Sequence, residues 1–77
     1  MNLKFVKDLE IKDIEKIRDG FEWFYSHQEY LKRYYSGKHV AIKDQKVIDC
    51  DKNLDRLIKR LRIRDCADSI AVEFVFP

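Results

Sequence analysis

The sequence has few of the residues that interrupt or cross-link a chain. Its 77 residues include one proline, two glycines and two cysteines. This scarcity excludes a flexible linker, a collagen-like repeat and a glycine-rich nucleotide loop. No apolar run approaches the roughly 20 residues that a membrane helix needs, and nothing indicates a signal peptide. We therefore expect a cytoplasmic protein with no membrane contact.

The composition is uniform, with 45% hydrophobic and 39% charged residues. It indicates a single domain over residues 1–77. A domain of this size buries only about 60–65% of its unfolded surface, so its core is thin. The 16 basic and 14 acidic side chains give a net charge of +2. That charge is too small to indicate a nucleic-acid binder by itself.

The cysteines and histidines predict neither a disulfide nor a metal site. Cys50 and Cys66 flank a predicted helix of about 12 residues, which would hold them about 18 Å apart. A disulfide needs Cα atoms less than about 7 Å apart, so free thiols and a reducing cytoplasm are expected. Adding His27 and His39 gives enough ligands for zinc, but their spacing matches no zinc finger or ribbon. We expect no metal and no cofactor.

A β-hairpin is predicted after Gly37, which fits the position that follows a helix C-terminus. A strand over residues 38–43 leads to a turn at Asp44-Gln45, and residues 46–49 return. Two registers stay open. A two-residue loop pairs Ile42 with Val47 and Val40 with Asp49, whereas a three-residue loop pairs Ile42 with Ile48 and Val40 with Cys50.

A helix follows the hairpin, with Asp51 and Asn53 as candidate N-caps. Four apolar residues lie on one narrow face of it: Leu54, Leu57, Ile58 and Leu61. Ile63 would point away from that face. We therefore expect the helix to end near Arg62 and Ile63 to tuck into the following loop.

Residues 69–76 predict a last strand that is apolar on both faces, which is typical of a strand inside a sheet. The β-β-α-β unit over residues 37–77 should make this strand parallel to one hairpin strand. The most economical arrangement puts it beside the first strand, in the middle of a three-stranded mixed sheet. With the helical residues 1–36 packed on that sheet, the fold class is α+β.

The N-terminal half predicts helix with a heptad pattern. Its apolar positions are Ile14, Ile17, Phe21, Phe24, Gln28, Leu31 and Tyr35. One long helix is an alternative, but Gly20 weakens a helix interior, and Ser26 with Glu29 forms a capping-box pattern. We therefore favour a helix over 8–19, a bend at 20–26 and a second helix over 27–36. The second helix should bury one face, made of His27, Tyr30, Leu31 and Tyr34.

Enzyme signatures are absent, since no nucleophile elbow, phosphate loop or H-E-x-x-H motif occurs. Asp44, Asp49 and Asp51 lack the pattern of a calcium loop and suit turn and cap roles. His39 suits an ordinary role on a strand. We expect no enzyme, no catalytic residue and no small-molecule substrate.

Two clusters could bind a macromolecule. Residues 52–64 hold six basic side chains against Asp55, which is either a solvated helix face or a surface for phosphate or an acidic partner. Residues 21–35 hold seven of the ten aromatic residues. These rings fit a core, a protein-contact surface or a platform for stacking bases.

Several motifs resemble a small prokaryotic family, frequent in archaea, that is classed as a domain of unknown function. They are Glu22-Trp23-Phe24-Tyr25, Tyr30-Leu31 to Tyr34, Gly37-Lys38-His39-Val40-Ala41-Ile42, Lys46-Val47-Ile48, Asn53-Leu54-Asp55 to Leu57-Ile58, and Val72-Glu73-Phe74-Val75. The resemblance covers residues 22–77. It implies a cytoplasmic β-β-α-β domain and transfers no functional residue. The family commonly has Asp-Gly where this chain has Asp44-Gln45.

The leading functional hypothesis is a non-enzymatic protein-interaction or regulatory module that forms a homodimer and contacts another protein. Its candidate dimer or partner surface is Ile14, Ile17, Phe21 and Phe24. The alternative is nucleic-acid binding. Its candidate surface is Trp23, Tyr25, Lys38, Arg56, Lys59, Arg60 and Arg62.

Overall fold

Two helices, a hairpin, a third helix and a last strand follow one another in a computed structural model that describes residues 11–64 and 69–77. The elements are α2 (Ile11–Ser26), α3 (Gln28–Tyr35), β1 (His39–Lys43), β2 (Lys46–Asp51), α4 (Leu54–Ile63) and β3 (Ala71–Phe74). The α+β class is therefore confirmed. The predicted helix start near residue 8 and Cys66 lie outside the described residues.

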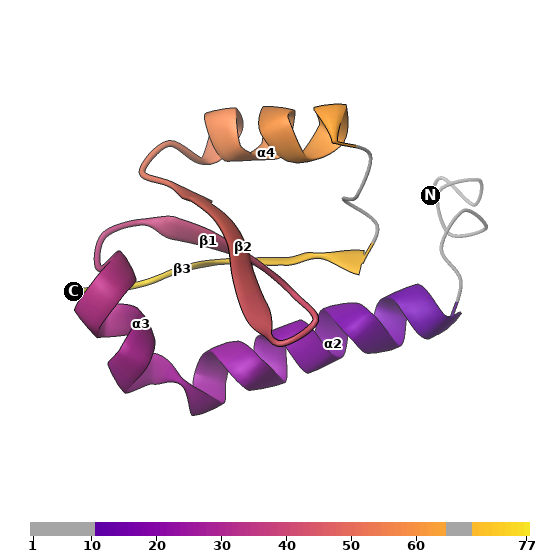
Figure 1. Ribbon diagram of the computed structural model, residues 1–77, viewed down its shortest axis with the longest axis horizontal. Coiled ribbons are helices and arrows are strands. Elements are labelled where there is room, and N and C mark those ends of the chain that lie inside the picture. Colours follow the sequence, from indigo (N-terminus) through magenta and orange to yellow (C-terminus); the bar gives the residue numbers. More distant parts are fainter. Residues whose placement is uncertain (1–10, 65–68) are drawn as a thin grey trace, which may run out of the picture.

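The three strands form one sheet in the order β2-β1-β3 (Figure 1). The last strand pairs with the first, as predicted, but two details of the prediction are wrong. The last strand lies at an edge rather than in the middle, and both pairs of neighbouring strands are antiparallel rather than mixed. The reason is that β2 and β3 run in the same direction with β1 between them, so this parallel pair shares no hydrogen bonds.

The hairpin combines the two registers left open by the sequence. Near the turn Ile42 pairs with Val47, as a two-residue loop requires. A bulge then shifts the register, so that Val40 pairs with Cys50 as in the alternative. The turn residues Asp44 and Gln45 have φ values of 53° and 59°, the left-handed pair that a tight hairpin turn needs.

The N-terminal segment is two helices, but the break lies later than predicted. Helix α2 continues through Gly20 to Ser26, and α3 begins at Gln28 after His27. A Cβ on Gly20 would lie 2.7 Å from the Cβ of Ala71, so this glycine allows α2 to approach β3 rather than bending the helix.

The predicted capping box is wrong. The Ser26 hydroxyl donates to the carbonyl oxygens of Glu22 and Trp23 inside α2, and no side-chain hydrogen bond caps α3 among the described residues. This bonding back into the preceding turn satisfies the hydroxyl within α2. Helix α3 therefore starts as a separate helix without a capping side chain.

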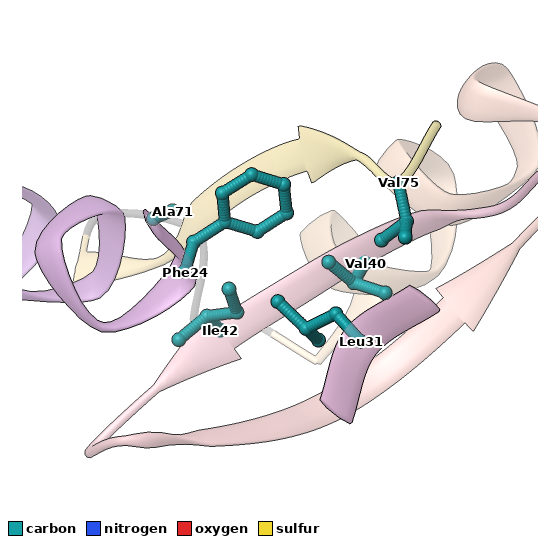
Figure 2. Packing of buried hydrophobic residues seen from close by; sticks show 6 residues of the cluster. All are labelled: Phe24, Leu31, Val40, Ile42, Ala71 and Val75. Atoms are coloured by element: carbon teal, nitrogen blue, oxygen red, sulfur yellow. The ribbon is translucent and has the colours of Figure 1, made fainter. Parts of the chain in front are cut away.

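The helices cover both faces of the sheet, with α2 and α3 on one face and α4 on the other (Figure 1). Six residues form the core on the α2 and α3 side, as Figure 2 shows: Phe24, Leu31, Val40, Ile42, Ala71 and Val75. A smaller cluster lies under α4: Ala41, Leu57, Leu61 and Ile70. Alternate residues of β1 thus reach different clusters, as the pleat requires.

Helix α4 begins as one of the two cap candidates predicts. The Asn53 side chain accepts a hydrogen bond from the backbone N–H of Arg56 at 3.0 Å. The far end of the helix differs from the prediction, because Ile63 is its last residue and is 83% exposed instead of being tucked into a loop. Of the four apolar residues on the predicted face, Leu57 and Leu61 are buried and Leu54 is exposed.

Candidate functional site

Two of the four residues of the candidate dimer surface predicted from the heptad pack in or against the chain's own core. Phe24 is 3% exposed inside the core, and Phe21 packs against the same cluster. Ile17 is half-buried, whereas Ile14 is 53% exposed. The heptad therefore marks the face that α2 and α3 turn toward the sheet, and Phe24 is not available to a partner.

Most aromatic residues of the segment 21–35 lie outside the core. Of these aromatic residues only Phe24 is buried, while Phe21, Trp23 and Tyr35 are half-buried. Tyr25, Tyr30 and Tyr34 are exposed. The prediction that α3 buries His27, Tyr30 and Tyr34 together with Leu31 is wrong, because Leu31 alone of these four reaches the core.

We call the side chains of Trp23, His27, Tyr30 and Tyr34 the aromatic surface. The rings of Trp23 and His27 stack with centroids 4.4 Å apart, and Tyr30 meets Trp23 edge-on at 6.4 Å. Tyr34 lies 5.1 Å from Tyr30. These side chains follow one another along the end of α2 and the exposed side of α3. The spacing of three and four residues within the helices places them there.

The aromatic surface is held in place by local contacts and contains a shallow hollow. Nδ1 of His27 lies 2.8 Å from the carbonyl oxygen of Trp23, which fixes the imidazole across the break between the helices. The hollow has a volume of about 290 Å³ and is lined by Tyr30 and Tyr34 together with Glu29 and Arg33. Apolar rings with one acidic and one basic group at their edge can accept a side chain from another molecule.

Several of the basic side chains on and next to α4 form ion pairs with carboxylates of β2 in the same chain. The guanidinium of Arg60 donates to both carboxylate oxygens of Asp49 at 3.1 and 3.2 Å and to Asp51 at 2.8 Å. Arg56 bonds Asp51 at 3.2 Å, and Arg64 bonds Asp49 at 3.3 Å. We call these five side chains the charge clamp. It fastens α4 to β2.

Three members of the charge clamp, Asp49, Asp51 and Arg60, have pKa values shifted in the directions that mutual attraction requires. The backbone N–H of Asn53 and the Arg60 guanidinium lower the pKa of Asp51 to about 2. Hydrogen bonds from Arg60 also lower the pKa of Asp49, and the two carboxylates raise the pKa of Arg60. Both carboxylates are therefore ionised at neutral pH.

The candidate nucleic-acid surface does not form one continuous patch. Its aromatic members lie on α2 and its α4 members lie across the sheet from them (Figure 1). Arg56 and Arg60 form ion pairs in the charge clamp, although Arg56 stays exposed, and Lys59 and Arg62 are exposed on α4 as well. The Tyr25 hydroxyl donates to Glu73 at 2.9 Å, which raises the pKa of Tyr25. Lys38 is half-buried beside the start of β1.

The sequence did not identify the charge clamp, although it contains a signal for it. Asp49 and Asp51 are two residues apart in a strand, so they share a face. Three arginines recur every four residues along α4 and its C-cap: Arg56, Arg60 and Arg64. Pairing these two patterns would have predicted ion pairs between the strand and the helix. Asp44 does occupy the turn, as predicted.

The remaining polar groups form no metal-binding cluster among residues 11–64 and 69–77. No cluster of three or more metal-ligating side chains occurs there. Cys50 is a half-buried free thiol, and the ring of His39 packs on Phe74 with centroids 4.9 Å apart. No helix in this part combines the length and apolar character needed to cross a membrane.

Comparison with known proteins adds a family but no activity. Residues 30–76 match a family model described as a family of unknown function (DUF5678). The match starts later than residue 22, where the sequence resemblance begins. The searches of the curated proteins and of the solved structures find no match.

Proposed function

The chain belongs to the family of unknown function DUF5678, and we propose that it is a non-enzymatic protein-interaction module whose contact site is the aromatic surface. One observation carries this proposal. Tyr30 and Tyr34 are 46% and 60% exposed although the domain has few large side chains with which to build a core. Rigid aromatic rings contribute much of the energy of protein interfaces at small entropic cost.

The charge around the aromatic surface favours a protein over a nucleic acid. Helices α2 and α3 together carry five basic and five acidic side chains, so their net charge is zero. Base-stacking platforms lie in basic grooves that follow the phosphate backbone. The excess basic charge of this chain lies on α4, on the opposite face of the sheet. The nucleic-acid alternative therefore has stacking groups and cationic groups on different sides of the molecule.

Site-specific photo-crosslinking in cells that express the full chain tests this proposal. We expect a photoreactive phenylalanine analogue at Tyr34 to give a covalent adduct with another protein. The same analogue at Ile63, which is more exposed but lies on α4, is the matched control and should give none. Tyr30→Ala, which removes the ring beside Tyr34 without touching the core, should reduce the Tyr34 adduct at least about tenfold if this ring anchors the contact.

Three results would contradict the proposal. Equal adducts from Tyr34 and Ile63 would mean that the chain crosslinks non-specifically at any exposed position. An adduct with nucleic acid would favour the alternative function. An adduct between two copies of the chain would place self-association on the aromatic surface instead of contact with a different protein.

A further inference from the structure

The two edges of the sheet differ in whether side chains bond their outward backbone groups. At the β2 edge, Cys50 pairs across the sheet with Val40. Its backbone N–H donates to the Asp49 carboxylate at 2.8 Å, and its carbonyl oxygen accepts from Arg60 at 3.0 Å. A bulge and the charged side chains of Asp49 and Asp51 interrupt the strand further. Such features prevent a second strand from pairing with an edge.

The β3 edge carries one charged side chain, Glu73, but among the described residues no bulge interrupts β3 and no side chain bonds its outward backbone groups. The N–H of Val75 donates to the carbonyl oxygen of Lys38 at 2.9 Å, and the Val75 carbonyl accepts from the N–H of Gly37 at 2.8 Å. Val75 thus directs both backbone groups toward β1. Alternate residues of an antiparallel strand face opposite sides, so Val72 and Phe74 direct theirs away from the sheet. No described residue pairs with them.

We propose that the β3 edge pairs antiparallel with the β3 edge of a second copy of this chain, which joins two sheets into one of six strands. The strand is apolar on the α4 side, where Val72 and Phe74 are half-buried and Phe76 is 69% exposed. The rings of Phe74 and Phe76 make an edge-to-face contact with centroids 4.9 Å apart. An unprotected edge with an apolar face is the kind of strand that pairs with another chain.

The side chains select one register for this pairing. If Glu73 lay on the two-fold axis, it would face the partner's Glu73, and like charges directly opposite destabilise a sheet. With Phe74 on the axis, Glu73 instead faces the partner's Val75. Val72 then faces the partner's Phe76, so the most exposed phenylalanine becomes covered. With Val72 on the axis Phe76 would stay uncovered, so we assign the Phe74-centred register.

A second copy fits this edge for two further reasons. The strand is its own complement in the Phe74-centred register, as a two-fold interface requires. A 77-residue domain with a thin core also gains stability by burying apolar surface between copies. In the joined sheet the two α2 helices lie on one face and the two α4 helices on the other. The β3 interface therefore does not use the aromatic surface, and the two proposals are independent.

The mass of the full chain in solution, followed over a concentration series by light scattering after size exclusion, tests the dimer. We expect twice the chain mass of 9.4 kDa. Val72→Pro removes an outward N–H from each copy and should raise the dissociation constant at least about tenfold. Val47→Pro is the matched control on the β2 edge, where the N–H also points outward, and it should leave the dimer unchanged. Circular dichroism checks that both variants fold.

Disulfide trapping tests the register and does not depend on how well Val72→Pro folds. In a chain carrying Cys50→Ala and Cys66→Ser, Phe74→Cys should oxidise to a covalent dimer, because residues opposite each other lie about 5.5 Å apart. Val72→Cys is the control and should not, since the two copies of residue 72 would lie about 13 Å apart along the strands.

The possible outcomes separate this proposal from the aromatic contact. A monomeric wild-type chain, or a dimer that Val47→Pro disrupts and Val72→Pro does not, would overturn the β3 pairing. Efficient trapping by Val72→Cys with none by Phe74→Cys would overturn the assigned register. None of these results changes the crosslinking expected at Tyr34, and loss of that crosslink would leave the β3 dimer intact.

Discussion

The two faces of the sheet are covered in different ways. On the α2 and α3 face, six buried apolar residues make direct contact, and Gly20 brings the helix backbone close to Ala71. On the α4 face the buried cluster is smaller, and the charge clamp joins the helix to β2 across its polar side. The comparison shows that one face depends on shape and apolar burial, whereas the other adds electrostatic contacts to a small core.

Leucine truncations on the two faces should give the largest effects. Leu31→Ala is expected to lower the free energy of unfolding by about 2–5 kcal/mol, because Leu31 is fully buried against the larger cluster. Leu57→Ala is the matched truncation under α4 and should cost less within that range. Urea denaturation at one protein concentration, with a stabilising osmolyte where needed, measures both. A larger loss for Leu57→Ala would contradict the comparison.

Gly20→Ala should come next and should destabilise the fold even though alanine favours helix. The added Cβ would lie 2.7 Å from the Ala71 Cβ, which has no flexible end to move aside. Overpacking costs about 1–3 kcal/mol, and the higher helix propensity of alanine stabilises α2 by about 1 kcal/mol, so a net loss of up to about 2 kcal/mol is expected. Adding Ala71→Gly should restore part of it. A variant as stable as wild type would show that α2 does not approach β3 this closely.

Asn53→Ala tests the start of α4. The side chain accepts a hydrogen bond from the backbone N–H of Arg56, and loss of such a cap typically costs about 1 kcal/mol. The substitution should destabilise α4 locally, whereas the local stability of α2 and α3 should not change. Hydrogen exchange of α4 amides against those of α2 measures the difference, and Asn53→Asp, which keeps an acceptor, is the control. Equal loss of protection in both helices would argue against a local effect.

Acid should weaken the α4 face with the smallest of these effects, because the clamp is partly exposed to solvent. The pKa of Asp51 is about 2 in the folded chain against an ordinary value of 3.8. A carboxyl whose pKa is lowered by folding stabilises the fold above the higher value, and that stabilisation is lost as the pH falls toward the lower one. Stability should therefore decline between about pH 4 and pH 2.

Thermal unfolding followed by circular dichroism over this pH range measures the acid effect. Asp51→Asn should make the decline shallower, and Asp44→Asn, in the turn and outside the clamp, should leave it unchanged. If Asp51→Asn shows the same decline as wild type, the charge clamp does not contribute to acid sensitivity.

Local patterns in the sequence were enough for most elements. Alternation of apolar residues predicts β1 and β2, helical spacing predicts α4, and Asn53 fits its N-cap. The bulge in the hairpin was not predictable, because both registers satisfy the alternation on one side of it. The break between α2 and α3 was misplaced because Gly20 was interpreted as a flexible point, whereas it is a site of close packing.

The candidate site was less predictable than the fold. The sequence places Trp23, Tyr30 and Tyr34 in one aromatic segment, but spacing alone cannot say which rings face the sheet. The heptad residues Phe24 and Leu31 take the buried positions and leave the tyrosines outside. The basic residues of α4 formed a candidate surface in sequence, and the acidic partners that neutralise part of it come from a different element, β2.

The sequence by itself determined the α+β class, the order of the elements and the alternating faces of the strands, because these depend on neighbours a few residues apart. Only the tertiary structure decided that β1 is the central strand and that the aromatic surface and the basic helix lie on opposite faces. It also decided that side chains bond the Cys50 backbone on the β2 edge, whereas no residue within 11–64 or 69–77 pairs with the outer edge of β3. Those features depend on contacts between residues distant in the chain, such as Arg60 with Asp49 and Gly20 with Ala71.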